Sequence, residues 1–298
     1  MHSSSLEKLI LEGCSSLVEV HQSIENLTSL VFLNLKRCWS LKILPESIGN
    51  VKSLKSLNIS GCSQLEKLPE RMGDLEFLTE LLADEIENEQ FLSSIGQLKY
   101  VRRLSLCGYS FRQDSPSPTS WVSQISSWLS PSSTSISSFI SAFVDWRSVK
   151  SLELPDGGLS DCATNCVDFR GLSALEVLDL SRNKLSSLPS GIGFLAKLET
   201  LIVQGCKYLV SILDLPSNLD HLIANGCRSL ERVRMPIESK KELYIELSYC
   251  YLLEEIQDIE GQSNISWTIW IDYRSHSPNK LQKSVVEVLF FSVFLAQK

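Results

Sequence analysis

The sequence repeats a pattern of leucines with a fixed period. Four successive units begin at Leu6, Leu30, Leu54 and Leu78, so each starts 24 residues after the one before. Within a unit, further apolar residues follow three and five positions after this first leucine. A period of this length is typical of a solenoid, in which every repeat forms one coil and stacks on its neighbours. We therefore expect the leucines to be buried between coils, because a single coil has no interior of its own.

The unit from Leu54 to Leu75 predicts both a strand and a turn. Leu57 and Ile59 are two residues apart, so on a β-strand their side chains point to the same side. After Cys62 the apolar spacing widens to three and four residues, which fits irregular turns or short helices on the opposite wall. The predicted fold is an α/β leucine-rich repeat solenoid of about ten repeats. We expect a curved horseshoe with a parallel β-sheet on its concave face and irregular or short helical segments on its convex face.

The repeat pattern divides the chain into four segments. A first block of repeats covers residues 1–109, and a second block covers residues 146–258. Between them, residues 110–145 are rich in serine but also contain tryptophan and phenylalanine, which predicts an insertion loop that packs partly on the solenoid or orders on binding. Residues 259–298 lack the period and form a C-terminal post-repeat segment. Because the repeats begin at once without a cap, we expect the chain to be a piece of a longer protein.

The positions of the cysteines indicate a reducing environment. The chain has nine cysteines. Six of them occupy the same position of their repeats, and one further repeat has asparagine there. These seven residues form the predicted cysteine ladder: Cys14, Cys38, Cys62, Asn183, Cys206, Cys227 and Cys250. Cysteine is small and tolerates burial, while asparagine would hydrogen-bond the backbone of the turn. Free thiols persist in the cytoplasm and nucleus, whereas the alternative of a disulfide scaffold does not explain the regular spacing.

Charge and hydropathy argue against two classes of partner. The formal net charge is -7 at pH 7, whereas a nucleic-acid-binding protein needs a basic face, so we expect no nucleic-acid partner. The sequence contains no stretch of about 20 apolar residues, so it predicts no membrane span.

No combination of residues predicts catalysis. The four histidines are scattered, and His221 is expected to point outward while the ladder cysteines point inward, so no Cys/His nucleophilic pair forms. Cys162 and Cys166 have no second pair of ligands nearby and make a poor zinc site. A Gly-x-x-x-x-Gly-Lys-Ser/Thr phosphate-binding loop does not occur in the sequence. We therefore expect a chain that is not an enzyme and holds no cofactor and no metal.

Two turn motifs connect the repeats to a known family. Leu44-Pro45-Glu-Ser-Ile48-Gly49 and Leu188-Pro189-Ser-Gly-Ile192-Gly193 share a Leu-Pro-x-x-Ile-Gly turn, and Gly61-Cys62-Ser-Gln-Leu65 carries a Gly-Cys-x-x-Leu turn. In these features the chain resembles the leucine-rich repeats of plant TIR-NBS-LRR disease-resistance proteins, over roughly residues 6–258. The TIR and nucleotide-binding domains of that family are not in the sequence. The resemblance implies the protein-interaction domain of an intracellular plant immune receptor, located in the cytoplasm or the nucleus.

The resemblance also implies partners for the repeats. These are a pathogen effector protein or a host guardee, and the nucleotide-binding domain of the parent receptor, which the repeats hold closed until an effector competes. Contacts are expected on the concave face, where outward side chains change from repeat to repeat. The predicted partner-binding residues are Phe32, Lys36, Arg37, Glu80, Asp84, Arg102, Arg103, His221 and Tyr244. Because arginines and aromatic residues are frequent interface anchors, Arg103→Glu is predicted to weaken binding and to leave folding alone.

The alternative is the ectodomain of an extracellular leucine-rich repeat receptor. It predicts glycans at the three Asn-x-Ser/Thr triplets, which begin at Asn26, Asn58 and Asn264. It also predicts oxidised cysteines, so a thiol titration of the unfolded protein separates the two hypotheses.

Overall fold

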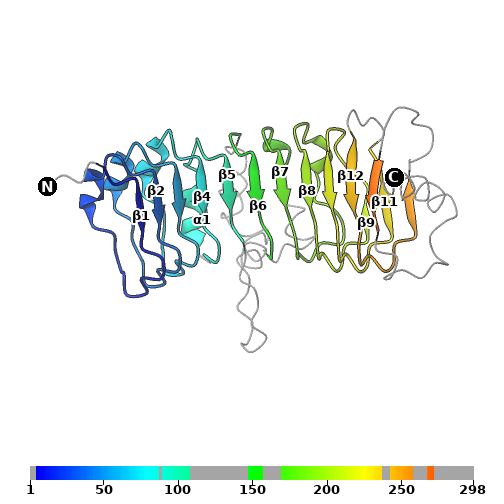
Figure 1. Ribbon diagram of the computed structural model, residues 1–298, viewed down its shortest axis with the longest axis horizontal. Coiled ribbons are helices and arrows are strands. Elements are labelled where there is room, and N and C mark those ends of the chain that lie inside the picture. The colour runs from blue at the N-terminus through cyan, green and yellow to red at the C-terminus, as the bar shows by residue number, and fades with distance from the viewer. Residues whose placement is uncertain are drawn as a thin grey trace, which may run out of the picture. The chain divides into compact units, whose positions relative to one another are not determined.

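The computed structural model describes residues 5–86, 89–107, 147–156, 169–236, 242–257 and 267–271. The predicted insertion loop at 110–145, Cys162 with Cys166, and most of the post-repeat segment lie outside the described residues. The chain divides into two compact units, Met1–Gly158 and Leu159–Lys298. In each unit, short strands run side by side along one side of a stack of coils (Figure 1).

Among the described residues of the first unit, six parallel strands line one side. They are β1 (Lys8–Ile10), β2 (Phe32–Asn34), β3 (Ser56–Asn58), β4 (Glu80–Leu82), β5 (Arg103–Ser105) and β6 (Ser151–Glu153). Each strand pairs in parallel with the next, and equivalent positions of successive repeats stand side by side, as Leu33 does with Leu57. From β1 to β4 the in-register stacking follows from the constant repeat length of 24 residues.

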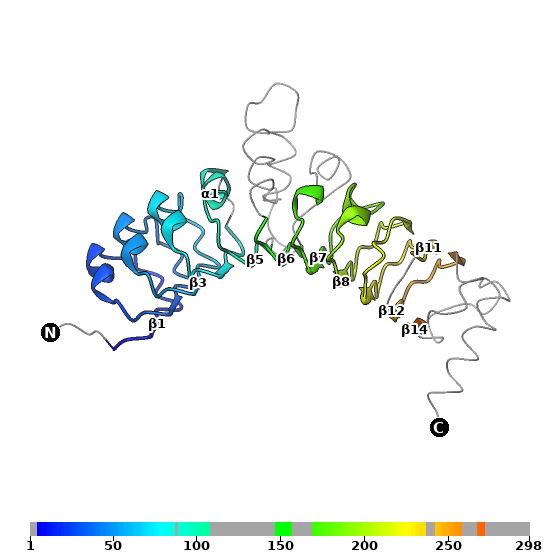
Figure 2. The ribbon, with the colours of Figure 1, turned by 90° about the horizontal axis from the view of Figure 1, so that it is seen from above.

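The return segments of the first unit are short helices. They contain the 3-10 helices η1 (Gln22–Asn26), η2 (Glu46–Asn50) and η3 (Glu70–Asp74) and the α-helix α1 (Glu89–Ile95). Figure 2 shows these helices on the side of the coils opposite to the strands.

The second unit has a main parallel sheet and a smaller one. The main sheet contains β7 (Val177–Asp179), β8 (Thr200–Ile202), β10 (His221–Ile223), β12 (Leu243–Glu246) and β14 (Trp267–Trp270). The smaller sheet contains β9 (Ser211–Ile212), β11 (Arg232–Arg234) and β13 (Glu255–Gln257), and the unit also has the 3-10 helices η4 (Phe169–Gly171) and η5 (Ile192–Phe194).

The smaller sheet was not predicted from the sequence. Each of its strands has one buried β-branched residue, at Ile212, Val233 and Ile256, next to more exposed polar neighbours. This alternation is typical of a half-buried strand, but it covers only two or three residues in each repeat. A pattern that short becomes recognisable only when the coils bring the three segments together.

The solenoid and its parallel sheet are confirmed. All ten predicted repeats contain a strand, and β14 adds another beyond them. The solenoid has about eight turns among the described residues, against the prediction of about ten. The leucine positions face the interior, and both Leu57 and Ile59 are fully buried at 0% exposure.

The glycine of the Leu-Pro-x-x-Ile-Gly turn allows adjacent coils to approach closely. A Cβ on Gly49 would lie 2.6 Å from the Cβ of Arg71 and 2.6 Å from its carbonyl oxygen on the next coil. At Gly73 the same atom would lie 2.9 Å from the carbonyl oxygen of Gln97. Any larger residue would therefore push the coils apart, so close packing of adjacent coils explains why this position of the turn is glycine.

The ladder position is a buried row of hydrogen-bond donors. The buried thiols are those of Cys38, Cys62, Cys206, Cys227 and Cys250. Each of these Sγ atoms donates to a backbone carbonyl of the preceding coil at 3.1–3.2 Å. Asn183 Nδ2 instead donates to the Leu180 carbonyl oxygen within its own turn at 2.9 Å. Cys14 differs from the expectation and is exposed, because no described coil packs over the first repeat.

Candidate functional site

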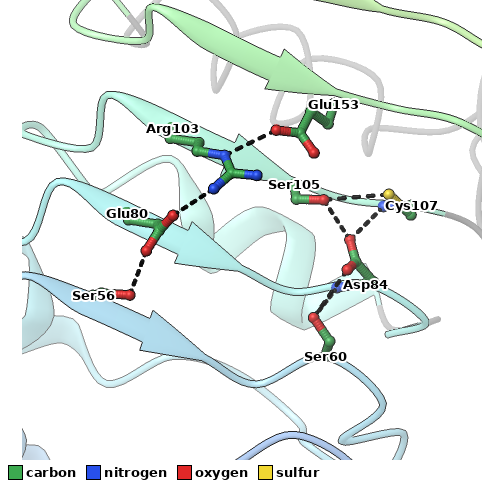
Figure 3. Close-up of polar contacts among 8 residues, drawn as sticks. All are labelled: Ser56, Ser60, Glu80, Asp84, Arg103, Ser105, Cys107 and Glu153. Carbon is green, nitrogen blue, oxygen red and sulfur yellow. Dashed lines mark hydrogen bonds and ion pairs between the residues drawn. The ribbon is translucent and has the colours of Figure 1, made fainter. Parts of the chain in front are cut away.

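Outward side chains of β3 to β6 and of the turns after β3, β4 and β5 form two neighbouring polar networks on the sheet face of the first unit (Figure 3). We name the two networks together the sheet-face cluster. Its members are Ser56, Ser60, Glu80, Asp84, Arg103, Ser105, Cys107 and Glu153. Because parallel pairing stacks equivalent positions about 4.8 Å apart, each of these side chains can reach the next coil.

Arg103 joins three neighbouring strands. Its Nη1 lies 2.7 Å from Glu80 Oε1 on β4, and its Nε lies 2.9 Å from Glu153 Oε1 on β6. The hydrogen bond to Glu153 is the main cause that raises the pKa of the Arg103 guanidinium above its ordinary value. Because the Arg103 side chain is 48% exposed, solvent screens both ion pairs, and each contributes about 0.2–1 kcal/mol at most. The pairing nevertheless occupies donors that a partner would otherwise use.

Glu80 extends this chain of contacts by one more strand. Its Oε2 accepts a hydrogen bond from Ser56 Oγ on β3 at 2.5 Å, while its Oε1 meets Arg103. Serine, glutamate and arginine at one repeat position thus connect through their side chains because the register places them side by side.

Asp84 braces the turns of three coils. Its Oδ1 accepts hydrogen bonds from Ser105 Oγ at 2.6 Å and from the Cys107 backbone N–H at 2.9 Å. Its Oδ2 accepts a hydrogen bond from Ser60 Oγ at 3.0 Å. Both serines are buried, so Asp84 satisfies polar groups that water does not reach. Its main role in the structure is therefore to hold the coils together.

Cys107 does not offer a nucleophile. Burial raises the pKa of the Cys107 thiol to about 12, and its Sγ lies 3.2 Å from Ser105 Oγ. Because the thiolate is the reactive form, a thiol with this pKa stays protonated and inert at neutral pH.

The remaining predicted contact residues of the first unit are free of such contacts. Arg37 and Arg102 are exposed, and Phe32 and Lys36 are half-buried. Within the described part of the chain, no hydrogen bond or ion pair involves the side chain of any of these four residues. Arg37 has a positive φ of 59°, which places its side chain at the turn that follows β2.

In the second unit, His221 and Tyr244 form an aromatic stack on the sheet face. They occupy paired positions of β10 and β12, and their ring centroids are 5.3 Å apart with an interplanar angle of 18°. A hydrogen bond to Glu242 raises the pKa of the Tyr244 hydroxyl. Both rings are exposed, so the stack presents an aromatic surface to solvent.

The sequence placed Glu80, Asp84 and Arg103 on the correct face, but it did not reveal that Glu80 pairs with Arg103 or that Asp84 accepts hydrogen bonds from the turns of the neighbouring coils. It also missed Glu153, which lies 50 residues after Arg103 because the predicted insertion separates their repeats. Strand register was the signal available, since Glu80 and Arg103 occupy the same position of successive repeats.

Membrane-spanning helices and clusters of metal ligands are absent from the described ranges. None of their helices is long and apolar enough to cross a membrane. They also contain no group of three or more His, Cys, Asp or Glu side chains arranged to hold a metal ion.

A family model described as "Leucine rich repeat" matches residues 147–207. The repeats are leucine-rich repeats. Among solved structures, the Toll–Spätzle complex of Drosophila matches 91% of this chain and 36% of its own chain, with a TM-score of 0.55 and 14% sequence identity. At this identity the likeness shows the fold alone.

Part of these leucine-rich repeats is homologous to plant disease-resistance proteins. TMV resistance protein N of Nicotiana glutinosa is 30% identical over 101 residues, which cover 34% of this chain and 8% of that protein. Disease resistance protein RPS4 of Arabidopsis thaliana is 43% identical over 67 residues, which cover 22% of this chain and 6% of that protein. The chain thus spans less than a tenth of the length of either relative. The predicted resemblance to the repeats of plant TIR-NBS-LRR proteins is confirmed as this partial homology.

Proposed function

We propose that these leucine-rich repeats are the protein-interaction domain of an intracellular plant immune receptor, acting in the cytoplasm or the nucleus. The partner is a pathogen effector protein, a host guardee, or the nucleotide-binding domain of the same receptor. The partial homology to plant disease-resistance proteins supports the class of protein. The reduced, buried cysteine ladder supports a compartment that keeps thiols free.

A contrast between neighbouring positions of the strands carries the proposal. The central residue of all six described strands of the first unit is leucine: Leu9, Leu33, Leu57, Leu81, Leu104 and Leu152. The residue directly before it changes in size and charge: Lys8, Phe32, Ser56, Glu80, Arg103 and Ser151. Packing demands the leucines and constrains the outward position much less, so this position can vary from repeat to repeat to suit a partner.

The contacts within the structure refine the predicted binding residues. Glu80, Asp84 and Arg103 are engaged with one another's coils, so we assign them to the stability of the sheet. We assign partner contacts to Phe32, Lys36, Arg37 and Arg102 in the first unit and to the stack of His221 and Tyr244 in the second. Aromatic and arginine side chains of this kind are frequent anchors of interfaces.

Autoinhibition by the repeats would follow the rules of a population shift. An effector that changes the open fraction of the receptor from about 1% to about 99% must bind the open state about 10⁴-fold more tightly than the closed one. The nucleotide-binding domain and the effector would therefore bind overlapping surfaces of the repeats, or binding of one would prevent binding of the other.

The test uses the transcript that contains this sequence. Full-length cloning should find coding sequence for TIR and nucleotide-binding domains upstream of the repeats. Binding of the encoded nucleotide-binding domain to the purified chain is then measured by calorimetry. Phe32→Ala should weaken binding about tenfold, because truncation of an aromatic anchor costs this order of affinity.

Phe77→Ala is the matched control, since Phe77 is 58% exposed and lies between η3 and β4, away from the sheet face. It should change the affinity less than about twofold. Equal losses in both variants would remove the sheet face from the proposal. A transcript without a nucleotide-binding domain would remove the receptor class.

A thiol titration of the unfolded protein from plant tissue addresses the ectodomain alternative. The intracellular proposal expects nine free thiols. Oxidised cysteines or glycans at the Asn-x-Ser/Thr triplets would favour the extracellular receptor instead.

A further inference from the structure

A hollow of about 560 Å³ crosses the turns that follow β7, β8, β10 and β12 in the second unit. We name it the basic groove, after its lining residues Arg182, Gly205, Lys207, Gly226, Arg228 and Tyr249. These residues occupy two equivalent positions in successive repeats, directly before and directly after the ladder residue.

The groove exists because two of its floor positions have no side chain. Arg182, Gly205, Gly226 and Tyr249 all adopt positive φ angles, of 58°, 71°, 74° and 63°. The two central residues are glycines, so a floor without side chains lies between Arg182 at one end and Tyr249 at the other. A Cβ on Gly226 would lie 3.8 Å from the Gly205 Cα, which is an ordinary contact.

The charge of the groove is opposite to that of the whole chain. The chain carries a net charge of -7, yet the groove is lined by three cationic side chains and by no carboxylate. Lys207 and Arg228 are exposed, and the described residues contain no ion pair to either of them. A carboxylate is present at the edge, where Glu246 Oε2 accepts a hydrogen bond from Asn225 Nδ2 at 2.7 Å.

Exposed aromatic rings stand at one end of the groove. Tyr249 is 51% exposed and Tyr251 is 44% exposed, and both line the hollow. Arginine next to exposed tyrosine is a combination that protein interfaces favour.

We propose that the basic groove binds an extended acidic segment of a partner polypeptide. Arginine binds a carboxylate through two parallel hydrogen bonds, and lysine adds a point charge. Four coils at about 4.8 Å spacing span about 14 Å, and an extended peptide rises about 3.3 Å per residue, so about four residues fit. This inference rests on the proposed function and names the chemical class of one partner.

The backbone of the floor favours a peptide over a phosphate group. The N–H of Gly205 donates to the Asn225 carbonyl oxygen at 2.7 Å, and the N–H of Gly226 donates to the Ser248 carbonyl oxygen at 2.7 Å. These amides are therefore not available to form the cluster of donors that typically holds phosphate. Recognition falls to side chains, which suit carboxylates spread along a strand.

The experiment measures fluorescence anisotropy of a labelled octaglutamate peptide added to the full chain at about 0.1 M salt. An octaglutamine peptide of the same length should bind at least about tenfold more weakly, because it lacks the charges. The double variant K207E/R228E should lose about tenfold or more in affinity for octaglutamate. The control K67E/K197E makes the same change in net charge at exposed sites outside the groove and should lose less than about twofold.

Gly226→Asn tests the shape of the groove without changing its charge. Asparagine tolerates a positive φ, so this variant should fold normally while filling the floor, and circular dichroism checks that it does. It should weaken octaglutamate binding about fivefold.

Equal losses in the groove and control variants would overturn the proposal, as would full affinity in Gly226→Asn. Tighter binding of a single-stranded oligonucleotide through the same residues would reassign the groove to nucleic acid. The comparison of Phe32→Ala with Phe77→Ala concerns the first unit. A negative result for octaglutamate binding at the basic groove therefore leaves the proposed function standing. Equal losses in Phe32→Ala and Phe77→Ala would count against the proposed function and would not account for a result at the groove.

Discussion

Replacing Asp84 with alanine should destabilise the repeats and not merely weaken a partner. The change removes the carboxylate that accepts hydrogen bonds from the Cys107 N–H and from Ser105 Oγ. Ser105 is only 2% exposed, so water cannot readily replace the lost acceptor. A buried donor left without an acceptor costs about 1–3 kcal/mol. Ser105 Oγ retains Cys107 Sγ at 3.2 Å as a weaker partner, so the loss of its hydrogen bond to Asp84 costs less free energy than that of the Cys107 N–H. Together these losses predict a decrease of about 2–4 kcal/mol in the free energy of unfolding.

Asp84→Asn is the matched control. Its amide oxygen can still accept from the Cys107 N–H and Ser105 Oγ, and its NH₂ group can donate to Ser60 Oγ, so stability should change by less than about 1 kcal/mol. Urea denaturation followed by circular dichroism measures both variants. A loss below about 0.5 kcal/mol for Asp84→Ala would show that the three turns do not depend on this carboxylate, and the stabilising role given to the sheet-face cluster would fail.

Three further predictions concern the core, the ion pairs and the thiols. Leu57→Ala should cost about 2–5 kcal/mol in urea denaturation, because the side chain is fully buried, and little change would place it outside the core. Arg103→Glu should cost about 1–2 kcal/mol, because it sets three carboxylates side by side, and added salt should recover part of the loss. This reverses the expectation from the sequence that Arg103→Glu leaves folding alone. The control is Arg102→Glu, which should be nearly neutral because Arg102 is exposed. Burial raises the pKa of the Cys62 thiol from 9.0 to about 12, so the stability it contributes is present below pH 9 and is lost as the pH rises toward 12. Unfolding measured across this range should show a flatter decline in Cys62→Ala, and an equal decline would contradict the assignment.

The partner-binding surface illustrates where sequence reasoning ends. Phe32 and Arg103 were equally good candidates from the sequence, because both precede the central leucine of a strand. In the structure Arg103 meets a glutamate on each side, while Phe32 is half-buried and has no polar group to pair with a neighbour. Which outward side chains bind each other depends on their neighbours on adjacent coils, and one of those neighbours lies across the predicted insertion.

The basic groove shows the same division. Its glycines and cations are visible in the sequence as Gly205-Cys206-Lys207 and Gly226-Cys227-Arg228, but each pair taken alone is an ordinary turn. Stacking the coils places the two glycines next to each other and opens the hollow between Arg182 and Tyr249.

The period of the leucines alone determined the coils, the strand positions and the inward direction of Leu57 and Cys62. Those features follow from burial of apolar groups at regular spacing, which any stacked arrangement of this sequence must satisfy. Only the tertiary structure decided which polar groups pair, where a second small sheet forms, and why Cys14 is exposed while Cys62 is buried. These outcomes depend on side chains of adjacent coils that are 20 or more residues apart in the chain, and a local pattern carries no record of such contacts.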